Sequence, residues 1–132
     1  MATQVMTITD FRNEPLTDFS DPENERRMRE ALDQVRSELG RSYPLILGDR
    51  EVHEGKLADS VNPARPEQVI GRFVQGTVEH VEEAMTTASE AFESWKRRSW
   101  EERADVVLRA ADVMRTRKFE LAALLVYEVS KS

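Results

Sequence analysis

Few residues in this 132-residue chain have the type and spacing that chemistry requires. The sequence has no cysteine, which excludes disulfides, thiolate zinc sites and a cysteine nucleophile. His53 and His80 lack a second ligand at metal-site spacing, so a structural role is the simpler interpretation of each. The glycines are too scattered for a phosphate-binding loop, and no serine stands in a Gly-x-Ser-x-Gly turn. We therefore expect no catalytic centre within this chain.

The composition restricts the partners that the chain can bind. The net charge is −6, and a chain with this charge is repelled by nucleic acid and by anionic membranes. No apolar run approaches the length of a membrane span, and Met1–Asp10 lacks the basic and apolar regions of a signal peptide. Together with the lack of cysteine, these features favour a cytoplasmic protein with no nucleic-acid and no membrane partner.

A helix is expected between residues 20 and 39. Ser20 is the expected N-cap, Glu23 is its expected capping-box partner, and Pro22 falls in the first turn, where no backbone N–H is needed. Gly40 is the expected stop at the C-terminal end. Apolar residues recur at helical spacing and predict one buried face, which comprises Met28, Ala31, Leu32, Val35 and Leu39.

Short strands in antiparallel pairs are expected in residues 43–76. Gly48-Asp49 is a turn signal between the first two strands, and Asn62-Pro63 is a second, because the residue before proline avoids helix. Gly71 lies inside the last strand, which indicates a bulge or the close approach of another segment. The expected strands are Tyr43–Leu47, Arg50–His53, Lys56–Val61 and Val69–Val74.

Three packed helices are expected in residues 77–132. The first runs from the N-cap Thr77 to Trp95, the second begins at a capping box of Ser99 and Glu102, and the third ends at Val129. Each carries an apolar stripe that we expect to face inward. The stripes are Val78, Val81, Ala84, Met85, Ala88, Ala91, Phe92 and Trp95, then Ala104, Val107, Leu108, Ala111 and Met114, then Leu121, Leu124, Leu125 and Val129.

The expected fold class is therefore α/β. Three segments follow from the pattern: an N-terminal arm and helix in residues 1–42, short strands and turns in residues 43–76, and a helical part in residues 77–132. The sequence shows no internal repeat and no low-complexity segment.

Several motifs follow one another in an order and at a spacing that resemble the aldehyde dehydrogenase superfamily. They are Val61-Asn62-Pro63-Ala64, Glu67-Gln68-Val69-Ile70-Gly71, Ala91-Phe92-Glu93-Ser94-Trp95, Glu102-Arg103-Ala104 and Glu128-Val129-Ser130-Lys131. Phe11-Arg12-Asn13-Glu14-Pro15 and Tyr43-Pro44-Leu45 are similar to one branch, the bacterial 1-pyrroline-5-carboxylate dehydrogenases (L-glutamate γ-semialdehyde dehydrogenases). The resemblance covers essentially the whole chain, and about the first quarter of such an enzyme.

The resemblance implies a partial aldehyde-dehydrogenase-like fold. The parallel nucleotide-binding sheet is then mostly absent, and residues 77–132 are the helical start of an NAD-binding domain. The parent enzyme, a homo-oligomer, would use NAD to oxidise L-glutamate γ-semialdehyde to glutamate in proline catabolism. In that family a cysteine attacks the aldehyde and hydride passes to NAD. Because this chain has no cysteine and the family's nucleotide loop lies beyond Ser132, we expect it alone to be inactive and to bind no NAD.

The resemblance also implies one ion site. Many aldehyde dehydrogenases hold a monovalent cation near the Asn-Pro segment and near an acidic residue at the end of this region. The matching positions are Ser60, Val61 and Glu128, where main-chain carbonyls and one carboxylate suit Na⁺ or K⁺. The alternative is that Glu128 simply faces solvent. Ser130 replaces the family's usual glycine, and serine makes a left-handed helix end costlier.

Three functions remain open from the sequence. The chain is part of a dehydrogenase, a non-catalytic interaction module that packs on a full-length relative or self-associates, or a helical binding domain unrelated to oxidation. The order of the motifs disfavours the last. The apolar stripe of the third helix has no nucleotide-binding sheet to cover it, so it packs on the preceding helices, self-associates or stays exposed. We expect marginal stability and self-association.

Overall fold

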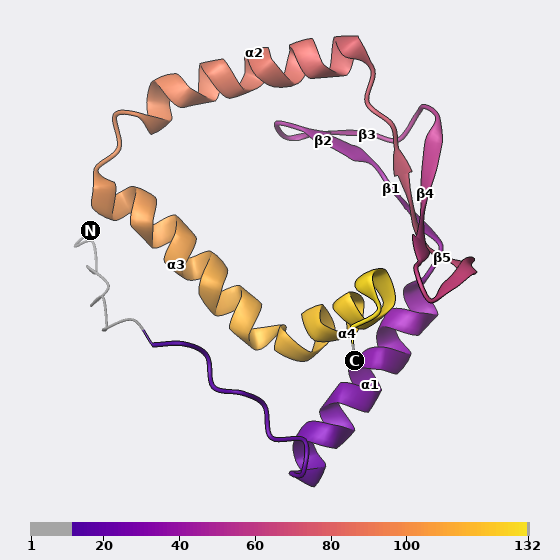
Figure 1. Ribbon diagram of the computed structural model, residues 1–132. Helices are drawn as coiled ribbons and strands as arrows, with labels where there is room; N and C mark the ends of the chain where they lie inside the picture. The colour runs from indigo at the N-terminus through magenta and orange to yellow at the C-terminus, as the bar shows by residue number, and fades with distance from the viewer. Residues whose placement is uncertain (1–11, 132) are drawn as a thin grey trace.

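Figure 1 shows the computed structural model, which describes residues 12–131. Residues 1–11 of the expected arm, and Ser132, lie outside the described residues. Figure 1 shows an open arrangement, in which α2 leads away from the strands and α3 leads back to α4. The chain contains both helices and strands, so the α/β class is confirmed. The elements are α1 (Pro22–Glu38), β1 (Arg41–Tyr43), β2 (Leu45–Leu47), β3 (Arg50–Val52), β4 (Leu57–Asn62), β5 (Arg65–Val74), α2 (Val78–Trp95), α3 (Trp100–Thr116) and α4 (Lys118–Val129).

Helix α1 has a different N-cap from the one that the sequence predicts. Asp21 is the cap, because its carboxylate accepts a hydrogen bond from the Glu23 N–H at 2.9 Å. The Ser20 hydroxyl instead donates to Asp18 Oδ1 at 2.7 Å, so the prediction of Ser20 as the cap is wrong. Gly40 follows the helix with a φ of 78°, which confirms it as the C-terminal stop.

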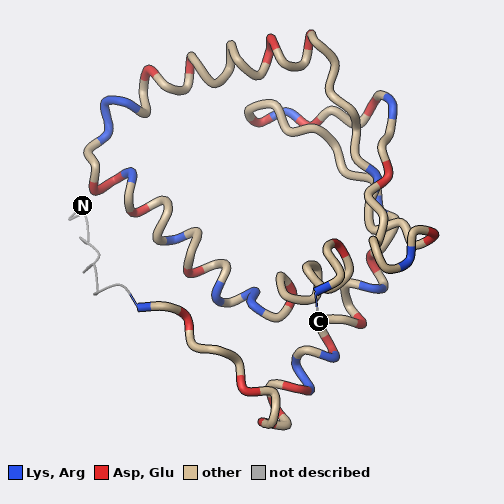
Figure 2. Tube along the Cα trace, viewed as in Figure 1, with Lys and Arg blue, Asp and Glu red and all other residues tan. Residues whose placement is uncertain are grey.

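Charges of both signs alternate along α1 (Figure 2), and they form ion pairs along its surface. Arg26 pairs with Glu23 at 2.6 Å and with Glu30 at 2.5 Å, and Arg29 pairs with Glu25 at 2.6 Å. These pairs are exposed and join residues three or four apart, so they support the helix weakly. The apolar face of α1 contributes more, because it is packed against the core.

Residues 43–47 form two strands instead of the single strand that the sequence predicts. Pro44 has no backbone N–H, and the chain changes sheet at this residue. Strand β1 pairs in parallel with β5, whereas β2 forms an antiparallel hairpin with β3 across the Gly48-Asp49 turn. The three-stranded sheet that contains β1 has the order β1-β5-β4. The hairpin is confirmed, but the parallel pair was not predicted, since local patterns do not show which distant strands meet.

Strand β5 is longer than predicted and contains a close approach at Gly71. A Cβ atom at Gly71 would lie 2.9 Å from Cε2 of Tyr43. The Tyr43 ring stacks on Phe73 with 5.1 Å between ring centroids. The β4–β5 register also shifts directly after the pair of Ser60 and Gly71. Both features that the sequence suggested for Gly71, a bulge and a close approach, are therefore present.

The hydrophobic core lies where α1, α4 and β5 meet. Its buried residues are Val35, Ile70, Ala123 and Tyr127, and Ala123 has no exposed surface. The predicted face of α1 is confirmed, because its other members pack against this cluster. The partly buried residues around the core are Met28, Ala31, Leu32, Leu39 and Leu124.

Helix α4 buries a face that only partly coincides with the predicted stripe, of which Leu124 packs against the core. Its buried residues are Phe119, Ala123 and Tyr127, which are four residues apart and therefore lie on one side of the helix. Leu125 and Val129 were predicted to face inward, but they are 49% and 48% exposed. The small side chain of Ala123 between two aromatic residues lets α4 approach α1 closely, which explains the choice of face.

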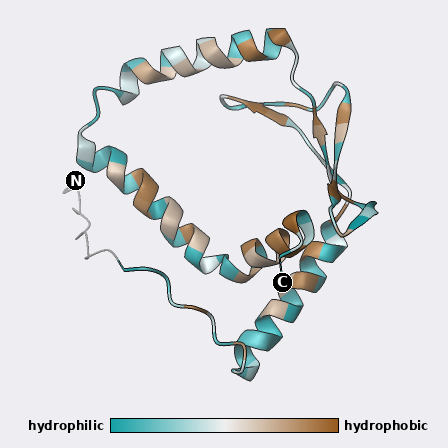
Figure 3. Cartoon of the chain, viewed as in Figure 1, coloured by the Kyte–Doolittle hydropathy of each residue, from teal (hydrophilic) through white to brown (hydrophobic). Residues whose placement is uncertain are grey.

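Helices α2 and α3 begin as predicted, but neither has a buried residue. Capping boxes start both helices, one between Thr77 and His80 and the other between Ser99 and Glu102. Apolar residues recur along both helices (Figure 3), and the predicted stripes are only partly covered: Ala84, Ala104, Leu108 and Ala111 are half-buried, whereas the larger side chains of the stripes are mostly exposed. We call the exposed set Val78, Val81, Met85 and Phe92 of α2, with Val107 and Met114 of α3, the α2–α3 surface.

Another face of α2 rests on the β2–β3 hairpin. Arg50 of β3 donates to both carboxylate oxygens of Glu83 on α2, each at 2.6 Å. At the tip of the hairpin, Gly48 has a φ of 64°, and a Cβ atom there would lie 2.9 Å from Cγ2 of Thr87. Glu83 and Thr87 are one helical turn apart, so the hairpin contacts one defined side of α2.

Candidate functional site

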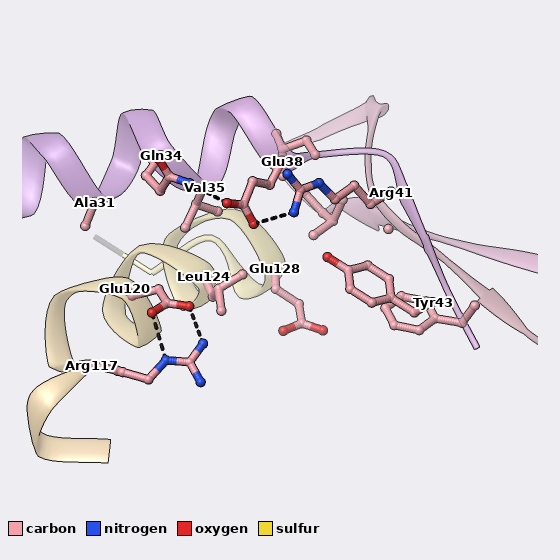
Figure 4. Close-up of a pocket in the computed structure, with 14 residues that line it drawn as sticks. Ala31, Gln34, Val35, Glu38, Arg41, Tyr43, Arg117, Glu120, Leu124 and Glu128 are labelled. Atoms are coloured by element: carbon pink, nitrogen blue, oxygen red, sulfur yellow. Dashed lines mark hydrogen bonds and ion pairs between the residues drawn. The ribbon is translucent and has the colours of Figure 1, made fainter. Parts of the chain in front are cut away.

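A hollow of about 620 Å³ lies between α1, α4 and the ends of β1 and β5 (Figure 4). Its apolar lining includes Ala31, Val35, Leu39, Ile70 and Leu124. Its charged lining comprises Glu38, Arg41, Arg117, Glu120 and Glu128. Among the described residues that line it, there is no serine, threonine or histidine. The hollow therefore offers packing and charge, but no serine or threonine hydroxyl and no imidazole for covalent catalysis.

The charges in the hollow are largely paired with each other. Arg117 Nε donates to Glu120 Oε2 at 2.8 Å, and a second guanidinium N–H donates to the other oxygen. This pair lowers the pKa of Glu120 and raises the pKa of Arg117. Glu38 forms an ion pair with Arg41 at 3.1 Å, as Figure 4 shows. Because the side chains of both ion pairs are substantially exposed, the pairs orient these side chains more than they stabilise the fold.

Tyr127 connects α4 to α1 beside this hollow. The Arg36 Nε–H donates to the Tyr127 hydroxyl at 3.0 Å, and the hydroxyl donates to the Leu32 carbonyl at 3.3 Å. The hydrogen bond from Arg36 to Tyr127 also raises the pKa of Arg36. The contact of Tyr127 with α1 was not predicted, although the four-residue spacing of Phe119, Ala123 and Tyr127 indicates a shared face of the helix.

Asn62 is the buried polar residue that ties the β4–β5 turn to the end of α4. It is 7% exposed, and its Oδ1 accepts the Ala64 N–H at 2.9 Å and the Ser130 hydroxyl at 3.2 Å. Its amide donates to Gln68 Oε1 at 2.9 Å. The sequence predicts a turn at Asn62-Pro63, which is confirmed, but not the contact with Ser130. That contact joins residues that are distant in sequence.

The residues predicted to bind a cation lie on two elements that meet at this corner. Ser60 is half-buried and Val61 is 39% exposed on β4, and Glu128 is exposed on the wall of the hollow. Because β4 is an edge strand, carbonyls of alternate residues point away from β5, and such carbonyl and carboxylate oxygens suit a hard cation. The site therefore has suitable donors and stays a prediction.

No group of three or more His, Asp or Glu residues within residues 12–131 is placed to hold a metal ion. In the same part of the chain, no helix has the length and apolar character needed to cross a membrane. His53 lies 3.0 Å from Glu51, and His80 completes a helix cap.

Comparison with known proteins gives the class of this protein. A sequence profile of the aldehyde dehydrogenase family matches residues 50–132, so the chain belongs to the aldehyde dehydrogenase family.

Within that class, the chain is similar to one particular enzyme. It is 45% identical over 124 residues to 1-pyrroline-5-carboxylate dehydrogenase of Geobacillus kaustophilus, a match that covers 94% of this chain and 24% of the relative. It is 44% identical to 1-pyrroline-5-carboxylate dehydrogenase 2 of Bacillus subtilis, with 93% and 24% covered. The chain thus spans about a quarter of the length of these relatives, and its resemblance to their N-terminal part is confirmed.

Solved structures give the same result for the fold. The 1-pyrroline-5-carboxylate dehydrogenase from Thermus with bound NAD is 43% identical and superposes with a TM-score of 0.88, over 92% of this chain and 24% of that one. The corresponding enzyme of Mycobacterium tuberculosis is 26% identical, with a TM-score of 0.81 over 96% and 24% of the two chains. The predicted partial aldehyde-dehydrogenase-like fold is confirmed.

Proposed function

We propose that this chain supplies the N-terminal part of an NAD-dependent dehydrogenase that oxidises L-glutamate γ-semialdehyde to glutamate in proline catabolism. The observation that carries the proposal is the extent of the similarity. The family profile begins at residue 50, yet the relatives align over 94% of the chain, so the alignment must include most of residues 1–49. Similarity in α1 and its surroundings, outside the profile, supports this one enzyme over the family at large.

In this proposal the chain contributes structure and not reacting groups. It has no cysteine, which is the nucleophile that the resemblance requires, so it is inactive by itself. Its sequence also has no glycine-rich nucleotide loop, so it binds no NAD by itself. Residues 77–132 are the helical start of the NAD-binding domain, preceded by the strands and turns of residues 43–76 and the arm and helix of residues 1–42. The complete enzyme is a cytoplasmic homo-oligomer.

A chimeric enzyme tests the proposal. This chain replaces the aligned N-terminal part of the Geobacillus kaustophilus relative, and NADH formation is measured with L-glutamate γ-semialdehyde. We expect the chimera to oxidise this substrate and the 132-residue chain alone to show no activity at the same concentration. A folded chimera that binds NAD but prefers simple aliphatic aldehydes would contradict the assignment of this branch.

A monovalent cation at Ser60, Val61 and Glu128 is part of the same proposal. Oxygen donors from an edge strand and an exposed carboxylate support weak binding of Na⁺ or K⁺. We expect NaCl or KCl to raise the melting temperature of the chimera more than choline chloride does, and Glu128→Gln to remove the difference. Equal shifts for all three salts would contradict the site.

An interaction module is the second candidate function, and the exposed α2–α3 surface favours it. Such a module would have no catalytic role and would pack on a full-length relative or on itself. Self-association predicts a melting temperature that rises with protein concentration, because the associated form is favoured by mass action. A sharp melt of a monomer at every concentration would argue against self-association.

A further inference from the structure

The chain exposes more surface than a folded monomer of its mass. Its accessible area is 10858 Å², whereas the size scaling of folded proteins gives roughly 7,100 Å² for 15.2 kDa. The difference is well above the ~800 Å² that one partner buries in a protein–protein interface of standard size. The exposed area is therefore large enough to include an interface of standard size.

The α2–α3 surface exposes several large apolar side chains. Val81 and Met85 are 60% and 64% exposed on α2, and Val107 and Met114 are 67% and 60% exposed on α3. On α2 the exposed apolar residues recur at intervals of three, four and seven, so they form one stripe. This stripe is distinct from the side of α2 that contacts the hairpin through Glu83 and Thr87.

The identity of the partner follows from the structural match. The arrangement of this chain is retained, with a TM-score of 0.88, in a Thermus dehydrogenase of which it covers only 24%. The open positions of α2 and α3 therefore occur in a protein that has about three-quarters of its chain left to surround them. If a second copy of this chain covered α2 and α3 instead, there would be no reason for the same arrangement to occur within a longer chain.

We propose that the α2–α3 surface is a docking surface for the remaining three-quarters of a 1-pyrroline-5-carboxylate dehydrogenase chain, and that it holds that part even when the two are separate polypeptides. The inference rests on the proposed function. The surface is ready to bind, because the capping boxes at Thr77 and Ser99 fix where its helices start without help from a partner.

The test uses the chimera described above, with a protease site placed between residue 132 of this chain and the remainder of the Geobacillus kaustophilus enzyme. Because both parts fold while joined, cleavage afterwards asks only whether they stay together. We expect the cleaved parts to co-elute in gel filtration. The dissociation rate is measured by exchange of the 132-residue part against a fluorescent copy.

Two neighbouring substitutions provide the matched comparison. Met85→Asp places a carboxylate in the apolar stripe, whereas Thr86→Asp adds the same charge on another face of α2. Both positions are exposed in the isolated chain, so circular dichroism should show equal helix content. We expect Met85→Asp to speed dissociation of the cleaved parts at least about tenfold, and Thr86→Asp to leave it near the unmodified rate.

The outcomes separate this inference from the proposed function. Separation of the unmodified parts on cleavage, or equal rates for the two variants, would overturn the docking surface. So would a stable dimer of the 132-residue chain that protects α2 and α3 and excludes the other part. Activity of the uncleaved chimera reports on the proposed function alone. Parts that stay together in a chimera without activity support the surface and reject the enzyme assignment.

Discussion

The region of α1, α4 and β5 and the region of α2 and α3 contain equally regular helices, but only the first has a core. Val35, Ala123 and Tyr127 are buried in the first region, whereas neither α2 nor α3 buries a residue. The helices of the second region are also well capped. Local signals therefore decide where a helix begins and ends, while tertiary partners decide whether its apolar face is covered.

The largest expected difference between the regions comes from the same truncation made in each. Phe119 is 8% exposed in the core region, and Phe92 is 55% exposed on α2. We expect Phe119→Ala to lower the free energy of unfolding by about 3 kcal/mol, because it leaves a cavity, and Phe92→Ala to lower it by less than about 0.5 kcal/mol. Urea unfolding followed by circular dichroism measures both. Similar losses would mean that α2 is packed in solution.

The second prediction concerns the polar link between the turn and α4. Asn62→Ala removes one donor and one acceptor that serve Gln68, Ala64 and Ser130. We expect a loss of about 2 kcal/mol in the free energy of unfolding, since the buried Asn62 side chain loses three hydrogen bonds. Asn13→Ala, in the exposed segment before α1, is the control, and its midpoint should match that of the unmodified chain. An equal midpoint for Asn62→Ala would show that this corner is open.

A smaller effect is expected at the end of α4. Ser130 has φ 52° and ψ 40°, which is a left-handed conformation that favours glycine. Ser130→Gly and Ser130→Ala both lose the hydroxyl that donates to Asn62, but only glycine relieves the backbone strain. We expect the glycine variant to be more stable than the alanine variant by about 1 kcal/mol in urea unfolding. Equal stabilities would indicate that the end of α4 is frayed.

The smallest effect is the pH dependence of the Arg117–Glu120 pair. The pKa of Glu120 is lowered from its ordinary 4.5 by the hydrogen bonds from Arg117. Stability from the pair is therefore present above the unfolded pKa and is lost as the pH falls through the folded pKa. We expect Arg117→Met to lower the urea midpoint slightly near neutral pH. In acid, below both the folded and the unfolded pKa of Glu120, the midpoint should not change. Arg109→Met, which removes an ion pair on α3, should change the midpoint at neither pH.

Local features of the fold were predictable from the sequence, whereas contacts between distant residues were not. The capping box of Ser99 and Glu102, the Gly48-Asp49 turn and the face of α1 follow from residues close in sequence. The parallel pairing of β1 with β5 does not, because it joins residues about thirty apart with no local signal.

The interior face of α4 was predicted only in part, for a related reason. Hydrophobicity alone favours its leucines, but the close approach to α1 requires a small residue, and Ala123 provides it. The hollow beside α4 was likewise outside the reach of the sequence, since α1 and α4 meet only in the folded chain. Glu128 was predicted as a site residue from resemblance, and its position on the wall of this hollow is new information.

The contact between Gly48 and Thr87 makes the β2–β3 hairpin a spacer of fixed length. A methyl group at residue 48 would press on α2 from 2.9 Å, and the left-handed backbone there resists any side chain. Replacing Gly48 with alanine would therefore push the side chain of Thr87 and, with it, α2 away from the hairpin. One methyl group at the hairpin tip would thus shift the α2 residues of the α2–α3 surface relative to the strands.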